Sequence, residues 1–107
     1  MMMEIKTYVV QEGHSDKIVQ GFSEPGAVEK APGFVDLSVL VQKPHKGEEE
    51  VVVIIRWESK EAWKQWELSD VHLAGHREAR EEKTPEWYIS GNTGHYELKA
   101  KKEPQPS

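Results

Sequence analysis

The stretch Glu50-Val-Val-Val-Ile-Ile-Arg-Trp57, continued by Glu58-Ser-Lys-Glu-Ala-Trp-Lys-Gln-Trp66, predicts a buried strand that leads into a short helix. The first part is apolar on both faces, which is typical of a central strand. Ser59 is a favoured residue just before a helix, and Glu61 suits the positive end of that helix. We therefore expect this strand to be central in the sheet and a short helix to follow it, ending at about Trp66.

The elements on either side of this unit complete a recognisable order. The pattern predicts further strands at 5–10 and 34–41, and an extended region at 87–99 that bends at 91–94. It predicts helices at 15–22, with Ser15 as the N-cap, at 27–30 as one extra turn, and at 70–82, with Ser69 as the N-cap. The order is βαββαβ, so we expect an α+β, ferredoxin-like fold: an antiparallel four-stranded sheet with helices on one face. The bare face favours a homodimer.

Length and composition limit the classes of function. The 107 residues suit one domain, which we place at 1–100, followed by a disordered tail at 101–107. The net charge is −5, which argues against nucleic acid as a partner. There is no cysteine, which excludes thiolate catalysis and iron–sulfur ligation. The chain shows no apolar signal core and no apolar run of about 18 residues, so we expect a cytoplasmic protein without a membrane partner.

Histidines and tryptophans are the side chains that could carry chemistry. His76 lies beside the small residues Ala74 and Gly75, which leave room for a bulky group to approach the ring. It could be an axial iron ligand, a general base, or a half-exposed histidine on an amphipathic helix. His72 and His76 have the i, i+4 spacing of a metal-binding pair, but no third ligand is evident.

The four tryptophans are more large aromatics than a marginal core requires. Trp66 stands ten residues before His76, across a Ser-Asp break. A histidine that offers a nitrogen ligand and a tryptophan that offers a rigid wall would suit a pocket for a flat, iron-containing cofactor. Aromatic residues at helical spacing are also common in cores, so both interpretations stay open at this point.

The chain resembles the heme-degrading monooxygenases of the Isd type, within the antibiotic-biosynthesis-monooxygenase superfamily. The resemblance covers nearly all of 4–100. Its best stretches are Val28-Glu-Lys-Ala-Pro-Gly-Phe34 and Arg56-Trp-Glu-Ser-Lys-Glu-Ala-Trp-Lys-Gln-Trp66, completed by Ser69-Asp70 and His76. The resemblance implies a ferredoxin-like homodimer, a dimeric α+β barrel, with one heme per subunit.

The resemblance also implies roles for individual residues. His76 would be the proximal heme ligand, and Trp66 would press on the porphyrin and distort it. The family has an asparagine on the first strand where this chain has Lys6. Lys6 could extend to solvent, or it could enter the pocket and donate a hydrogen bond on the oxygen side of the heme or to a propionate; a register shift of one would place Thr7 there. Phe22 is a candidate apolar wall or plain core.

The resulting hypothesis is a monooxygenase that binds heme as cofactor and substrate. It would open the porphyrin with O2 and electrons from an external donor, either a reductase or a small reductant, and release iron. One alternative is a cofactor-free monooxygenase of the same superfamily that acts on a quinol or a polycyclic aromatic, with His76 as a base. The other alternative is a heme-binding carrier or sensor without turnover.

Overall fold

The computed structural model describes residues 1–74 and 84–106. Its sheet has four antiparallel strands in the order β2-β3-β1-β4, which confirms the expected α+β, ferredoxin-like fold. Residues 70–74 are also helical. The elements along the chain are β1 (Met2–Gln11), α1 (Ser15–Ser23), the 3-10 helix η1 (Val28–Lys30), β2 (Phe34–Val41), β3 (Glu48–Trp57), α2 (Lys60–Glu67) and β4 (Tyr88–Glu97).

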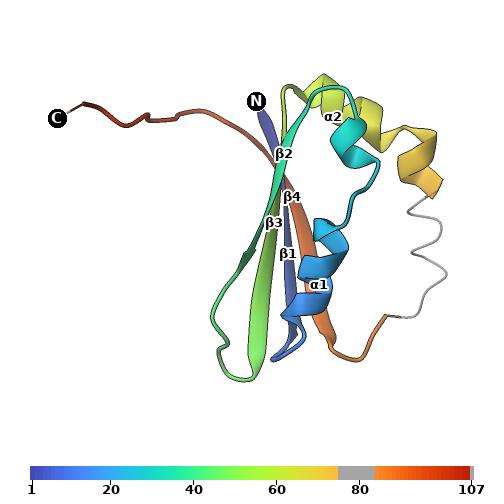
Figure 1. Cartoon of the computed structure of the whole chain (residues 1–107), viewed down its shortest axis with the longest axis vertical. Helices are drawn as coiled ribbons and strands as arrows, with labels where there is room; N and C mark the ends of the chain where they lie inside the picture. The colour runs from blue at the N-terminus through green and yellow to red at the C-terminus, as the bar shows by residue number, and fades with distance from the viewer. Residues whose placement is uncertain (75–83, 107) are drawn as a thin grey trace.

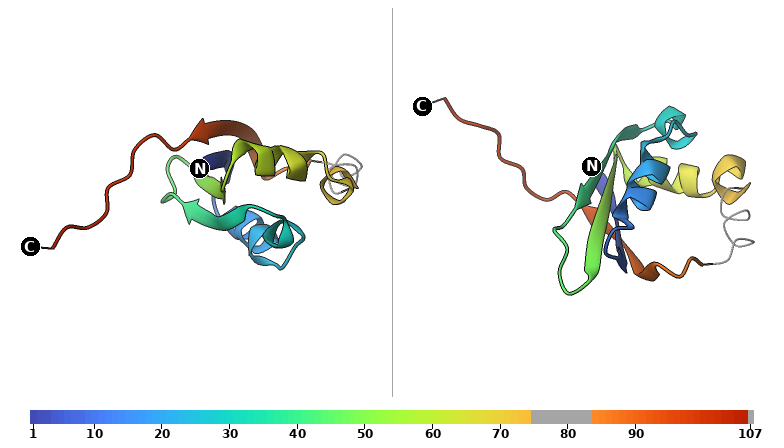
Figure 2. Two further views of the ribbon diagram at one scale, coloured as in Figure 1. Left: turned by 90° about the horizontal axis from the view of Figure 1, so that it is seen from above. Right: turned by 60° about the horizontal axis from the view of Figure 1, so that its bottom comes forward.

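The helices lie on one face of the sheet. Figure 1 shows α1 and α2 on the same side, with the opposite side of the sheet uncovered. Figure 2 shows two groups of helices over that face: α1 together with η1, and α2. The chain after β4 carries no regular structure in the described residues and extends away from the sheet. Within the described chain, no helix combines the length and the apolar character that crossing a membrane requires.

Strand β3 alternates buried and partly buried residues, and its buried side faces the helices. Val51, Val53, Ile55 and Trp57 are the buried apolar members, and Trp57 is fully buried. Residue pairing across β1 and β3 places Lys6 opposite Val53, on the same helix-covered face. The core is therefore a single layer between the sheet and its helices. Side chains of β1 that point into this layer can reach the space between the helices.

Two of the three predicted helix N-caps are confirmed, and one is wrong. The Ser59 hydroxyl accepts a hydrogen bond from the Ala62 amide, and the Ser69 hydroxyl accepts one from the His72 amide, as expected for N-caps. The prediction that Ser15 is an N-cap was wrong: α1 begins at Ser15 itself. The Ser15 hydroxyl instead donates to the carboxylate of Glu49, which also accepts a hydrogen bond from the Gly13 amide.

The bend expected at 91–94 was also wrong, because β4 runs without interruption from Tyr88 to Glu97. The glycines there serve close packing rather than a turn. A side chain at Gly91 would meet the Tyr88 hydroxyl, and one at Gly94 would meet the Tyr96 ring at 2.7–3.0 Å. Glycine in a strand interior often marks such a close approach.

Candidate functional site

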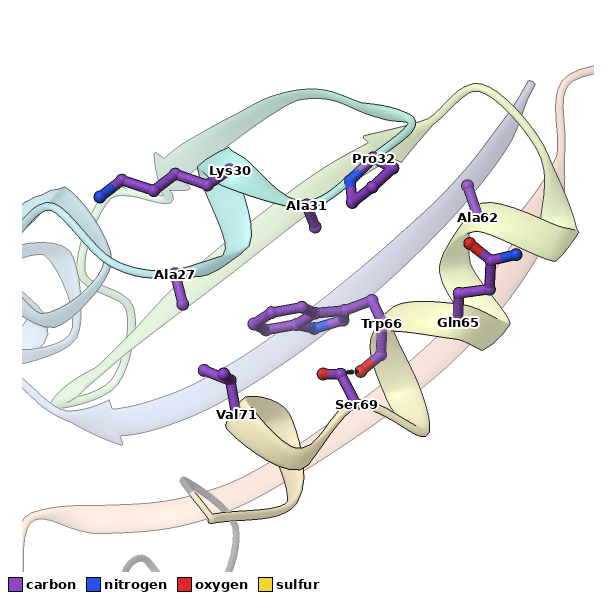
Figure 3. Close-up of a pocket in the computed structure, with 9 residues that line it drawn as sticks. All are labelled: Ala27, Lys30, Ala31, Pro32, Ala62, Gln65, Trp66, Ser69 and Val71. Carbon is purple, nitrogen blue, oxygen red and sulfur yellow. Dashed lines mark hydrogen bonds between the residues drawn. The ribbon is translucent and has the colours of Figure 1, made fainter.

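A cavity of about 360 Å³ lies between η1 and the end of α2. This volume falls in the range of small-molecule sites, roughly 300–1,000 Å³, which are mostly apolar with a few polar groups. Figure 3 shows the Trp66 indole extending from α2 between Ala27 and Ala31 on one side and Val71 on the other. The lining residues are Ala27, Lys30, Ala31, Pro32, Ala62, Gln65, Trp66, Ser69 and Val71.

The Trp66 indole is held from behind by two other rings. Its centroid lies 6.4 Å from that of Trp57 in the core and 5.1 Å from that of His72. Because Trp57 is fully buried, these contacts fix the indole to the rigid part of the fold. The partly buried Trp66 therefore presents a flat, positioned surface to the cavity.

Lys6 lies on the helix-covered face of the sheet, and Thr7 lies on the opposite face. The pairing register places Lys6 opposite Val53 and Thr93, in line with Glu4 and Tyr8 on β1. Within residues 1–74 and 84–106, the Lys6 ammonium makes no hydrogen bond or ion pair. The strand therefore points the lysine, rather than the threonine, toward the layer that the helices cover.

Phe22, on α1, lies at the other side of this layer. Its ring centroid is 6.1 Å from that of Tyr8, and it packs against the buried core. Burial raises the pKa of the Tyr8 hydroxyl, and the nearby Tyr88 adds to the effect. These contacts agree with Phe22 as plain core, while its role as a wall for a ligand stays a prediction.

His76 falls outside the residues that the structure describes, so its expected role as an iron ligand stays a prediction. The same holds for the proposed His72–His76 metal-binding pair. His72 itself is described. Its ring lies against Trp66, and its Nε2 atom is 2.8 Å from a carboxylate oxygen of Glu67.

Two further features were missed by reasoning from the sequence. Lys30 lines the cavity and is the one cation among its described lining residues, although its side chain runs away from the indole (Figure 3). A second group of polar side chains, Glu4, Glu67 and His95, gathers where β1, β4 and the end of α2 meet. Lys30 could have been noted from the sequence, because it is the basic residue within 28–34. No spacing along the chain connects Glu4, Glu67 and His95.

The sequence is similar to those of known proteins. The model of the antibiotic biosynthesis monooxygenase family matches residues 1–78. The heme-degrading monooxygenase HmoA of Bacillus subtilis is 42% identical over 103 residues, which are 96% of this chain and 95% of that protein. A heme-degrading monooxygenase of Halalkalibacterium halodurans is 29% identical over 97% of this chain and 87% of its own.

The chain is also similar to solved structures. A Bacillus cereus protein described as an antibiotic biosynthesis monooxygenase superposes with a TM-score of 0.84 and 47% identity, over 96% of this chain and 97% of that one. A variant of MhuD, which carries two manganese protoporphyrin IX molecules in its active site, superposes with a TM-score of 0.67 and 28% identity. The match covers 92% of this chain and 94% of that one.

Proposed function

Because the chain belongs to the antibiotic biosynthesis monooxygenase family, we propose that it is a heme-degrading monooxygenase, for which heme is both cofactor and substrate. The observation that carries this proposal is the Trp66 indole, fixed by Trp57 and standing in an apolar cavity. A planar aromatic wall in an apolar site is what a porphyrin needs to leave water.

The described residues fit a heme in their chemistry. The cavity lining is mainly apolar, which suits the ring, and the edge residue Lys30 offers a cation for a propionate. His76, placed six residues after Asp70, would supply the neutral imidazole that heme iron requires. Contact between the ring and the indole would let Trp66 distort the macrocycle, which is one of the ways a protein tunes a heme.

Lys6 would take the place of the asparagine found in the family. It shares the helix-covered face with the core strand β3, and the described residues leave its ammonium without a partner. A cationic donor at this position could hold an anionic group of the heme or supply a proton on the side where oxygen reacts. Bound heme would supply the iron centre for oxygen reduction and the ring that is opened, with electrons from a reductase or a small reductant.

The uncovered face of the sheet supports a homodimer. The register places one row of apolar residues from β1, β2, β3 and β4 on this face, away from the helices. Leu40 and Tyr96 in this row are 49% and 55% exposed. Packing of two such faces would bury them and close the sheets into a barrel. The row comprises Met3, Ile5, Val9, Leu40, Val52, Ile54 and Tyr96.

Aerobic turnover with ascorbate tests the proposed reaction. Purified protein is loaded with one equivalent of hemin, and the absorption spectrum and the ferrous iron trapped by a chelator are followed over time. We expect the Soret band to decay while iron is released, and we expect neither change without oxygen. A Soret band that persists for hours under reductant would instead indicate a carrier or sensor. Oxygen uptake with quinols in the absence of heme would indicate the cofactor-free alternative.

A further inference from the structure

A second cluster of polar side chains lies beside the cavity and shares no residue with its lining. Glu4 comes from β1, Glu67 from the last turn of α2, and His95 from β4. One donor atom from each of the three lies within 4.8 Å of the other two. Residues separated by up to 91 positions therefore bring two carboxylates and one imidazole to a single point.

Neighbouring side chains hold each carboxylate in place. Glu4 is only 5% exposed, and its Oε2 atom lies 3.3 Å from the Trp63 indole nitrogen and 3.2 Å from His95 Nε2. Glu67 lies beside His72, whose Nε2 atom is 2.8 Å from its carboxylate. Metal ligands are commonly oriented by outer hydrogen bonds such as the one that the Trp63 indole donates to Glu4.

Two carboxylates meet here, each with one imidazole beside it. Two carboxylates close together repel, and burial of one of them strengthens the repulsion because solvent screens it less. A divalent ion between them would offset both charges. Donors around one ion with bonds of about 2.0–2.2 Å stand roughly 3–4 Å apart, so separations up to 4.8 Å need only small side-chain movements.

The cluster is open to solvent at His95. A second cavity, of about 300 Å³, opens beside it and is lined by Trp63 and His95, together with Met2, Lys60, Tyr96 and Glu97. The side chain of His95 is 41% exposed, whereas that of Glu4 is 7% exposed. An ion could therefore meet His95 first and the buried carboxylate second.

We infer that Glu4, Glu67 and His95 form a binding site for one divalent transition-metal ion, with Trp63 hydrogen-bonded to Glu4 and His72 lying beside Glu67. Two oxygen donors and one imidazole suit the class that includes Mn²⁺, Fe²⁺ and Zn²⁺, and three protein ligands leave positions open for water. His72, which lies beside Glu67, also contacts Trp66 of the first cavity.

Calorimetric titration of the full-length, heme-free protein with Zn²⁺ tests this inference. We expect one ion per chain at micromolar affinity. His95→Ala and Glu67→Gln should each weaken binding by at least about tenfold, since loss of even an outer-shell group costs roughly 10–100-fold. His45→Ala, which removes an exposed histidine from the turn before β3, should leave the affinity unchanged. Thermal unfolding of each variant without metal shows that it is folded.

His76→Ala separates this inference from the proposed function. It should keep the full Zn²⁺ affinity, because the site does not use His76, and it should lose heme coordination. Absence of micromolar Zn²⁺ binding, or binding that survives His95→Ala, would overturn the inference. Binding lost in His76→Ala would also overturn it, because the ion would then belong to the His72–His76 pair. None of these outcomes depends on heme turnover.

Discussion

The Trp66 indole rests on the Trp57 indole, with ring centroids 6.4 Å apart and planes inclined by 30°. One ring is fully buried in the core, and the other stands in the cavity. The contact joins the end of β3 to the last turn of α2. It makes the wall of the candidate site a direct extension of the core, so changes at Trp66 should affect both binding and stability.

Trp66→Ala should weaken hemin binding by at least about tenfold and destabilise the fold by roughly 2 kcal/mol. The stability cost is below the roughly 3–5 kcal/mol of a fully buried aromatic, because Trp66 is only partly buried. Trp66→Phe should recover most of both. Hemin titration and urea unfolding measure the two effects. Trp87→Ala, which removes a tryptophan stacked on His14 far from the cavity, is the control and should leave hemin affinity unchanged.

Lys6→Ala should slow heme decay under ascorbate by roughly a hundred- to a thousandfold, the scale of losing one positioned donor, while hemin still binds. Thr7→Ala is the matched control, because the register turns Thr7 to the opposite face. If heme decay is slow in Thr7→Ala and normal in Lys6→Ala, then Thr7, and not Lys6, is the residue of β1 that enters the pocket. Single-turnover spectra of the two variants decide between them.

Gly33→Ala should destabilise the protein by roughly 1–3 kcal/mol. Gly33 has φ of +83°, and a side chain there would run into Ala62 of α2. Its carbonyl oxygen also accepts a hydrogen bond of 2.8 Å from the Glu58 amide. This bond links the segment after η1 to the segment before α2, and both segments lead to residues that line the cavity. Gly21→Ala, in α1 with open space around it, should instead stabilise by up to about 1 kcal/mol. In urea unfolding, the free energy of unfolding should therefore fall in Gly33→Ala and rise in Gly21→Ala.

Glu49 should make stability depend on pH in the acid range. Hydrogen bonds from the Ser15 hydroxyl and the Gly13 amide lower the pKa of Glu49 below its ordinary value of 4.5. The unfolded chain therefore binds the proton first, so this stabilisation is complete above the ordinary pKa and is lost as pH falls through the lowered one. In a pH series of urea midpoints, Glu49→Gln should lose stability at neutral pH and show a flatter acid slope, unlike the exposed Glu12→Gln. Parallel acid slopes for wild type and Glu49→Gln would contradict this assignment.

The sequence predicted the elements well where the signal was local. The bounds of β2, the Ser59 cap and the Ser69 cap all rest on residues within a few positions of one another. The prediction for the start of α1 failed because the Ser15 hydroxyl and the Gly13 amide donate to Glu49, a residue 34 positions away from Ser15. No propensity at Ser15 can reveal such a partner.

The same distinction applies to the site. Trp66 could be singled out because it stands only ten residues before His76 in the sequence, and the structure places it in a cavity. The position of Lys6 depends on the register of β1 against two strands distant in sequence, which only the assembled sheet provides. The Glu4–Glu67–His95 cluster needs three elements at once and so has no sequence pattern.

The most direct measurement is a hemin titration followed by absorption spectroscopy on wild type, His76→Ala and His72→Ala. The account predicts a shifted Soret band with one-to-one saturation in wild type. It predicts loss of iron coordination in His76→Ala, and retention of coordination in His72→Ala, whose ring contacts Trp66 without ligating iron. No Soret shift in wild type, or an unchanged spectrum in His76→Ala, would contradict it.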